Sequence, residues 1–228
     1  MYNHYMNIAW KSSYEKYNYG DVFYALVHTY RPEKVVELGT KEGYSAYHIA
    51  RALSENGNGT LDCYDHDKAA MDRARENVKE FSPIVSFTTS DALGIDKQYK
   101  SIDILHVDLD NDADVLDEVV PAWINKVKHC IILEGGSVPR DELASKTNFR
   151  KMPVSKWLES INASSDELFA SSAQSQDTMQ QYVVVEGKSE YKEKPIAPWL
   201  TRLRQRFENI QYITLEPFPS LTIITKQP

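Results

Sequence analysis

The sequence of 228 residues predicts an α/β protein with a doubly wound, mostly parallel sheet. Five short apolar segments alternate with stretches whose apolar residues recur at helical spacing. Each of the five is followed closely by a glycine or a carboxylate, and two further apolar segments close the chain. In such a fold the carboxyl ends of the parallel strands share one edge, where ligands bind.

The composition is that of an ordinary globular protein, and we expect a single domain over residues 1–228. Hydrophobic residues make up 42% and charged residues 26% of the chain, and the formal net charge is -7. Because phosphate backbones repel such a charge, we expect no nucleic-acid partner. No apolar run approaches the length of a membrane helix, and MYNHYMNIAW lacks the features of a signal peptide, so we expect a cytoplasmic protein without a membrane partner.

Residues 1–31 are predicted to form an aromatic, helical N-terminal segment. Its rings could pack over the mouth of a cleft or simply against the body of the protein, and both interpretations stay open. Asp21 is expected to cap a helix that Arg31-Pro32 ends. The aromatic residues before this helix are Tyr2, Tyr5, Trp10, Tyr14, Tyr17 and Tyr19.

The stretch KVVELGTKEGYSAYHI, residues 34–49, predicts a strand, a glycine loop and a helix. Gly39 and Gly43 are four residues apart, and Glu37 lies two residues before Gly39. Gly39 permits a tight turn, and the first N–H groups of the helix face whatever is bound there. The dinucleotide fingerprint G-x-G-x-x-G is not matched, since Lys41 stands where its second glycine would be.

The second and third strands are predicted over residues 60–64 and 84–89, and each is followed by an acid. Asp65 is well placed to accept hydrogen bonds from both hydroxyls of a ribose, since a carboxylate suits a vicinal diol. Asp67 is expected to cap a charged helix that runs to about Phe81. Ser90-Asp91-Ala92 follows the third strand, where Asp91 is either a helix cap or a ligand contact.

The fourth and fifth strands, residues 102–107 and 130–133, are followed by Asp108 and Glu134. Between Asp103 and Val120 there are seven carboxylates and no lysine or arginine. Helix N-termini favour part of this charge, but Asp108 stands at the strand tip itself. His106 is interpreted as a hydrogen-bonded core histidine, with a catalytic role as the alternative. Cys63 and Cys130 fall inside predicted strands, where we expect reduced core cysteines.

Residues 137–208 are too many for a single crossover helix, and we expect an insertion or lid. Within it, Met152 to Ile161 can form a helical turn, and a helix carrying Arg202, Arg204 and Arg206 follows. Residues 210–215 and 221–225 predict two closely joined strands, which must be antiparallel neighbours at a sheet edge.

These features resemble class I S-adenosylmethionine-dependent methyltransferases, specifically their small-molecule branch. The resemblance rests on Glu37-x-Gly39-x-x-x-Gly43, on the acids after the second and fourth strands and on the C-terminal hairpin, and it covers residues 33–134 and 208–226. It implies a seven-stranded sheet with an antiparallel last strand. It also implies S-adenosylmethionine as the cofactor, whose cationic sulfonium and ammonium groups favour an acidic cleft. The implied cofactor-binding residues are Glu37, Gly39, Thr40, Gly43, Ser45, Asp65, His66, Asp91, Ala92 and Asp108.

The expected reaction is methyl transfer to a small polar acceptor, more readily at oxygen than at nitrogen. Asp108 is the expected general base, with Asp110, Glu134 and His106 behind it. Alternatively, Asp108 and Glu134 could hold a divalent cation such as Mg²⁺. That branch often has histidine where Asn111 stands, and glycines follow Glu134 here, which weakens the metal interpretation.

Two other functions stay open at this stage. One is a non-catalytic, Rossmann-like protein that binds a partner through the insertion, and the other is an NAD-dependent oxidoreductase. The sequence leaves the acceptor and the oligomeric state undecided, with a homodimer as one alternative.

Overall fold

The computed structural model describes residues 10, 12–109, 112–137, 149–153, 182–186, 195–216 and 219–227. Asp110 and Asn111, together with most of the predicted insertion, lie outside these residues. The chain divides into a main unit, Met1–Asp141 with Lys194–Pro228, and a second unit, Glu142–Glu193. In the second unit, strands β6 (Phe149–Pro153) and β7 (Tyr182–Glu186) pair antiparallel. The helical turn expected to begin at Met152 is therefore wrong at its first two residues, because they pair with β7.

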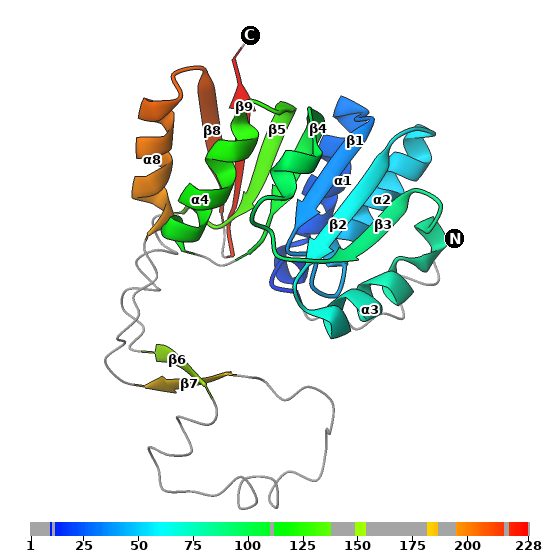
Figure 1. The fold of residues 1–228 in the computed structure, drawn as a ribbon, viewed down its shortest axis with the longest axis horizontal. Helices are drawn as coiled ribbons and strands as arrows, with labels where there is room; N and C mark the ends of the chain where they lie inside the picture. Colours follow the sequence, from blue (N-terminus) through cyan, green and yellow to red (C-terminus); the bar gives the residue numbers. More distant parts are fainter. Residues whose placement is uncertain are drawn as a thin grey trace, which may run out of the picture. The chain divides into compact units, whose positions relative to one another are not determined.

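The main unit is built on a seven-stranded sheet in the order β3-β2-β1-β4-β5-β9-β8 (Figure 1). Strands β1 to β5 pair in parallel, whereas β9 runs antiparallel to both β5 and β8. This confirms the predicted parallel sheet, with its C-terminal hairpin at one edge. The strands are β1 (Lys34–Leu38), β2 (Thr60–Asp65), β3 (Val85–Thr89), β4 (Ile102–Val107), β5 (Val127–Glu134), β8 (Ile210–Leu215) and β9 (Leu221–Lys226).

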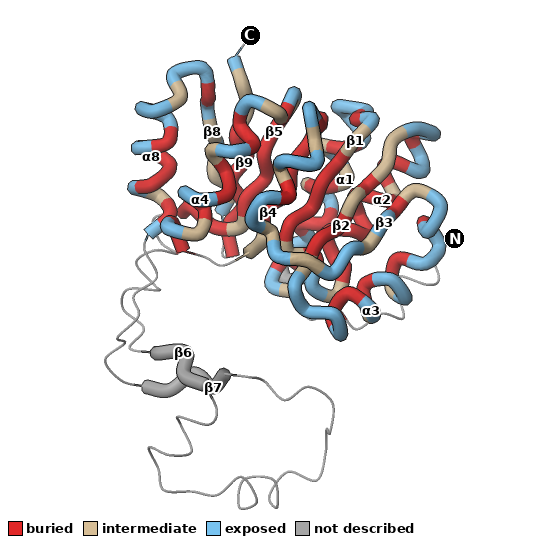
Figure 2. Tube along the Cα trace, viewed as in Figure 1, coloured by how far each residue is buried: buried red, intermediate tan, exposed pale blue. Residues whose placement is uncertain are grey.

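Helices cover both faces of this sheet because alternate residues of each strand point to opposite sides. Val35 of β1 packs in the core with helices α1 and α2, whereas Val36 packs in the core with α4 and α8. The central strands are accordingly buried along their length (Figure 2). The helices are α1 (Tyr19–Tyr30), α2 (Tyr44–Asn56), α3 (Lys68–Asn77), α4 (Ala113–Ile124) and α8 (Ile196–Arg206), with short 3-10 turns at Glu15–Tyr17, Lys79–Phe81 and Ile95–Gln98.

Two helix starts test the expected caps. The Asp67 side chain accepts hydrogen bonds from the backbone N–H groups of Ala69 and Ala70, which confirms it as the cap of α3. The cap expected at Asp21 is wrong, because α1 begins at Tyr19 and Asp21 lies in its first turn. An acid there still meets the positive end of the helix dipole.

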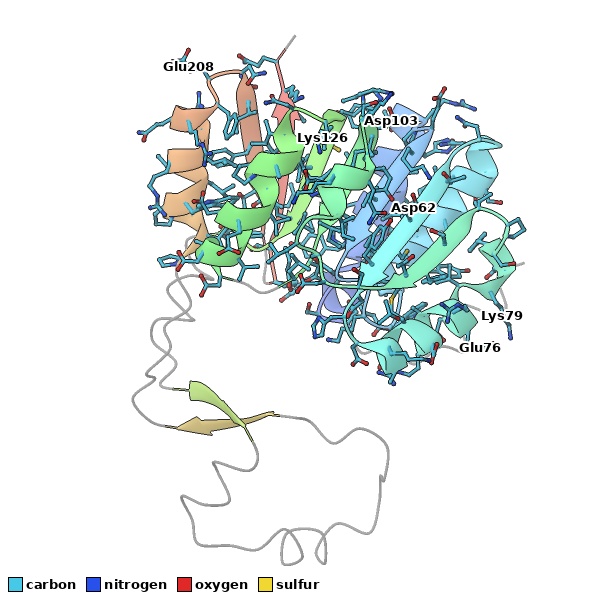
Figure 3. All side chains as sticks on the ribbon, viewed as in Figure 1. Asp62, Glu76, Lys79, Asp103, Lys126 and Glu208 are labelled. Atoms are coloured by element: carbon cyan, nitrogen blue, oxygen red, sulfur yellow. The ribbon has the colours of Figure 1, made fainter. Side chains whose placement is uncertain are left out.

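The amino end of β4 is fixed by Asp103, which is 4% exposed. Its carboxylate accepts hydrogen bonds of 2.8 Å from the backbone N–H groups of Glu33 and Lys34 and from Lys128 Nζ. Figure 3 shows Asp103 and Lys126 near this edge of the sheet. The acid-rich stretch therefore begins with a structural residue, one strand length away from Asp108.

Two further expectations concern the described residues alone. Cys63 and Cys130 are free thiols, buried in β2 and β5 as predicted. No helix in the described part of the chain is both long enough and apolar enough to cross a membrane.

Candidate active site

The glycine loop, residues 39–43, lies at the carboxyl end of β1 between the tips of β2 and β4. The Gly39 N–H donates to the Tyr64 carbonyl at 2.8 Å, and the Asp108 N–H donates to the Leu38 carbonyl at 2.8 Å. Gly39 and Gly43 have φ angles of 87° and 88°, which disfavour any residue with a side chain. A Cβ atom on Gly39 would lie 1.9 Å from the Asp108 carbonyl oxygen. The backbone approach between the two strand tips therefore requires glycine.

Asp65, at the tip of β2, holds this loop in place. Its Oδ2 accepts a hydrogen bond from the Lys41 N–H at 2.7 Å, and its Oδ1 accepts one from the Asp67 N–H at 2.8 Å. Lys41 has a φ of 51°, a conformation that a lysine rarely adopts without support. Each oxygen keeps a second lone pair, so the role predicted for Asp65 with a ribose remains chemically open.

Glu37 lies beneath the loop, with none of its surface exposed. Its Oε1 accepts from Ser45 Oγ at 2.6 Å and lies 2.9 Å from His106 Nδ1, and its Oε2 accepts from Cys63 Sγ at 3.5 Å. Glu37 and His106 are direct neighbours across β1 and β4. Both carboxylate oxygens of Glu37 thus have hydrogen-bond partners inside the protein. Ser45 lies between Glu37 and the pocket described below.

Asp108 and Glu134 form a carboxyl pair at the tips of β4 and β5. Burial raises the pKa of Asp108 well above its usual range, and the charge and hydrogen bond of the Glu134 carboxyl raise it further, while Lys41 opposes the shift. Ser13 Oγ donates to Glu134 Oε1 at 3.1 Å. Burial and the nearby carboxylates of Asp108 and Glu134 also raise the pKa of Tyr14, which keeps its phenol protonated.

A pocket opens above the glycine loop, between the loop and the N-terminal segment. Trp10 packs on Tyr44 and Tyr47 with ring centroids 5.5 and 5.9 Å apart, and Tyr14 packs edge-on against Phe23 at 5.3 Å. Trp10 and Tyr14 therefore line a pocket and also pack against the protein body, as both interpretations had it. Tyr17 is exposed, and Tyr2 and Tyr5 lie outside the described residues. The pocket is lined by Trp10, Ser12, Tyr14, Thr40, Lys41, Glu42, Tyr44, Ser45 and Asp108.

Seven of the ten predicted cofactor residues lie outside this lining: Glu37, Gly39, Gly43 and Asp65, described above, and His66, Asp91 and Ala92. His66 is 89% exposed, and its Nδ1 lies 3.8 Å from Asp65 Oδ1. Asp91 is exposed after β3, where its Oδ1 accepts a hydrogen bond from the Leu93 N–H at 2.9 Å. Ala92 is partly buried against the core on the α4 side of the sheet. Their roles as cofactor residues stay predictions. The helix-cap alternative for Asp91 is wrong, because the next helix begins after Gly94 and Asp91 only closes a local turn.

The sequence did not predict that Ser13 donates a hydrogen bond to Glu134, or that Glu37 pairs with His106. The strand IDILHV signalled a buried histidine, but which residue it faces depends on the register of β1 and β4. Ser13 carries no pattern of its own. Among the described residues, no three His, Cys, Asp or Glu side chains cluster as metal ligands.

Comparisons with known proteins agree with this architecture. Residues 36–133 match the family model of a methyltransferase domain. No curated protein sequence matches the chain. Among solved structures, an O-methyltransferase from Bacillus cereus in complex with SAH is 18% identical, with a TM-score of 0.56, covering 96% of this chain and 84% of that one.

Two further structures have the same fold. A SAH-bound methyltransferase from Podospora anserina is 12% identical, with a TM-score of 0.58 over 99% of this chain and 87% of that one. The O-methyltransferase TomG from Streptomyces achromogenes, involved in tomaymycin synthesis and in complex with SAM, is 13% identical, with a TM-score of 0.56 over 92% of this chain and 79% of that one.

The chain therefore has the Rossmann-like fold of methyltransferases. Within that fold, residues 36–133, from β1 to β5, match a methyltransferase domain.

Proposed function

We propose that this protein is a class I S-adenosylmethionine-dependent methyltransferase, which transfers the methyl group of its donor to an oxygen atom of a small polar molecule. The observation that carries the proposal is the Asp108–Glu134 carboxyl pair, which stands beside the glycine loop at the tips of adjacent strands. Such a pair can remove the proton of a hydroxyl acceptor. The solved structures named above as O-methyltransferases support the same choice of acceptor atom.

The residues around the glycine loop fit a donor of this kind. Ser45 and Thr40 line the pocket with their hydroxyls, and Asp65 offers its remaining lone pairs to the ribose. Bound there, S-adenosylmethionine would supply an activated methyl group, which the acceptor oxygen would take in line while S-adenosylhomocysteine leaves with the electron pair of the carbon–sulfur bond. The carboxylates suit the positive charge of this donor.

Asp108 has the central role in the transfer. In its ionised form it accepts the proton of the acceptor hydroxyl, so that the oxygen carries an electron pair to the methyl carbon as the carbon–sulfur bond breaks. Burial, and then the Glu134 carboxyl, raise the pKa of Asp108, which makes it a stronger base toward the acceptor hydroxyl. Tyr14 and the aromatic wall beside it exclude water from the pocket.

A divalent cation such as Mg²⁺ is the second way to activate the acceptor. Asp108 and Glu134 would be its protein ligands, and two carboxylates are enough for magnesium when water and substrate oxygens complete its shell. The cation would lower the pKa of the acceptor hydroxyl. Activity that survives EDTA would favour the carboxyl pair alone, whereas activity that Mg²⁺ restores would favour the cation.

The remaining expectations form part of the proposal. With a net charge of -7, the acceptor is a small molecule rather than a nucleic acid. We place the enzyme in the cytoplasm, with residues 137–208 as an insertion. A homodimer is the assembly to test by light scattering.

Thermal unfolding with S-adenosylhomocysteine or with NAD tests the donor. An increase in Tm with S-adenosylhomocysteine alone is the expected result, since a ligand stabilises the state that binds it. A response to NAD alone would overturn the proposal in favour of an oxidoreductase, and no response to either would favour a binding protein without catalysis. Transfer of a labelled methyl group to a panel of phenols, catechols and amines then tests the acceptor atom.

A further inference from the structure

One wall of the pocket is formed by a short segment before α1, which we call the strap and which comprises Trp10 and residues 12–17. Trp10, Ser12 and Tyr14 of the strap line the pocket, and the rest of the lining belongs to the glycine loop, to the start of α2 and to Asp108. Trp10 and Tyr14 are 7% and 2% exposed, so the strap is packed down in this structure. A ligand beneath it is therefore covered from this side.

The strap leads into a helix start that is fixed to the body of the protein. Tyr19 Oη donates a hydrogen bond of 3.2 Å to the Leu215 carbonyl at the end of β8. A Cβ atom on Gly20 would lie 2.2 Å from His48 Nε2, so the backbone of α1 lies directly against a side chain of α2. The first turn of α1 is thus held on two sides, and a movement of the strap has to begin before it.

Asn18, between the strap and α1, has the backbone conformation of a hinge residue. Its φ and ψ angles are 54° and 38°, a left-handed conformation that asparagine tolerates better than most residues. On the strap side the backbone hydrogen bonds are local, since the Glu15 N–H bonds to the Ser12 carbonyl at 3.3 Å and the Asn18 N–H to the Glu15 carbonyl at 3.1 Å. The Tyr19 N–H bonds across Asn18 to the Tyr14 carbonyl at 3.1 Å, and a rotation at Asn18 would break this bond.

At its other end the strap is tied to the carboxyl pair. Ser13 Oγ donates a hydrogen bond of 3.1 Å to Glu134 Oε1, which joins two residues 121 positions apart. Ser13 is exposed and does not belong to the lining of the pocket, so this bond acts on the strap without touching a ligand. The next residue, Tyr14, is buried beside Asp108. The strap therefore covers the pocket and contacts both carboxyls in the same position.

We propose that the strap is a gate, hinged at Asn18 and latched by the Ser13–Glu134 hydrogen bond, which opens to let the methyl donor in and its product out. Closing the gate excludes water from the pocket and engages Glu134 in one movement. The open state is a minor one, because Trp10 and Tyr14 bury apolar surface only while the gate is closed. This inference rests on the proposed function, because the ligands that pass the gate are S-adenosylmethionine and S-adenosylhomocysteine.

A gate has a kinetic signature that a direct contact with the ligand lacks. If the ligand enters and leaves only through the open state, its association and dissociation rate constants both scale with the fraction of open protein. Loss of the latch raises this fraction with and without ligand, so both rate constants rise together and Kd stays the same. Loss of a direct contact raises mainly the dissociation rate constant, and Kd with it.

Surface plasmon resonance with S-adenosylhomocysteine measures both rate constants in the wild type, Ser13→Ala and Asn18→Ala. Ser86→Ala is the matched control, because Ser86 is also an exposed serine whose Oγ donates to a carboxylate, that of Asp62, at 2.8 Å. Neither Ser86 nor Asp62 lines the pocket. Hydrogen exchange of the backbone N–H groups of Glu15, Asn18 and Tyr19, followed by mass spectrometry, measures the opening itself without ligand.

In Ser13→Ala we expect both rate constants to rise by about fivefold, the usual value of one net hydrogen bond, while Kd stays within about twofold of the wild type. Asn18→Ala should raise both rate constants as well, since alanine fits the left-handed backbone of the closed strap less well than asparagine. Hydrogen exchange in the strap should be faster in these two variants. Ser86→Ala should behave like the wild type in both measurements.

Two outcomes would overturn the gate while leaving the proposed function intact. One is a pair of rate constants that stays unchanged in Ser13→Ala and Asn18→Ala, whether or not hydrogen exchange becomes faster. The other is a rise of the dissociation rate constant alone, which would make the strap a direct ligand contact. A wild type that binds no S-adenosylhomocysteine would instead overturn the proposed function itself, and the gate for this donor with it.

Discussion

The backbone N–H of Lys41 donates a hydrogen bond of 2.7 Å to the Asp65 carboxylate, so the tip of β2 directly supports the glycine loop that follows β1. The sequence predicts Asp65 as a ribose ligand, and its position shows that it also supports the glycine loop. It holds Lys41 in a left-handed conformation that the loop needs and that a lysine adopts at some cost in free energy.

The first prediction concerns this double role. Asp65→Ala removes both the support of the loop and the predicted ribose acceptor, so we expect the affinity for S-adenosylhomocysteine to fall by more than about tenfold, with a loss of unfolding free energy of about 1 kcal/mol. Calorimetry and urea unfolding measure the two quantities. Asp67→Ala is the control, since it removes a helix cap without touching the loop. An unchanged affinity in Asp65→Ala would remove Asp65 from the site.

The second prediction compares two glycines with similar backbone angles. Gly39 and Gly57 have φ angles of 87° and 72°, but a Cβ on Gly57 meets nothing within 4 Å, whereas one on Gly39 would lie 1.9 Å from the Asp108 carbonyl oxygen. Gly57→Ala should cost only the left-handed conformation, about 1 kcal/mol in urea unfolding. Gly39→Ala should cost distinctly more and should abolish donor binding. Equal costs for the two variants would contradict the close approach of the strand tips.

The third prediction addresses the carboxyl pair. Asp108→Asn should lower kcat by about 10²–10⁴-fold, the usual contribution of a general base, while donor affinity changes little. Glu134→Gln removes a charge that raises the pKa of Asp108. Since the base acts when ionised, the rate falls as pH drops through this pKa, and in Glu134→Gln that fall should move to lower pH. Initial rates between pH 5 and 9 in EDTA measure both effects. A pH profile identical to that of the wild type would contradict the coupling.

The fourth prediction concerns stability at acidic pH. Burial lowers the pKa of His48 to about 4, against the raising effect of Asp21 and with a smaller lowering effect of Arg51. An unfolded chain takes up this proton near pH 6.5, whereas the folded protein excludes it until about pH 4, so the unfolding free energy decreases as pH falls through this window. The decrease from His48 is at most about 3 kcal/mol. His48→Gln, followed by urea unfolding at pH 7 and at pH 4.5, should lose less stability than the wild type over the same interval.

Much of the fold could be predicted because its signals are local. The apolar strands, the intervening helical spacing and the short C-terminal hairpin each lie within a few residues of sequence, and all five parallel strands were placed within three residues of their observed starts. Asp67 was identified as a cap for the same reason, since it bonds to the helix it precedes. The cap at Asp21 failed because α1 already begins at Tyr19, two residues earlier.

The site was harder to predict because it depends on pairing between distant strands. The acids at the strand tips could be named from their positions, but their partners could not. Glu37 was expected to bind the donor. The register of β1 against β4 shows instead that Glu37 is a neighbour of His106, and Ser45 donates a hydrogen bond to it. Likewise, the contact of Ser13 with Glu134 spans 121 positions and carries no sequence pattern.

Asp103, described above as the residue that fixes the amino end of β4, separates two kinds of acid within one strand. Its hydrogen bonds to Glu33, Lys34 and Lys128 stabilise the fold. Asp108, five residues later, is the residue that we propose as the general base. Thermal tolerance and turnover can therefore be tuned independently along β4. Engineering for heat resistance belongs at its first residues, where changes leave the reacting groups undisturbed.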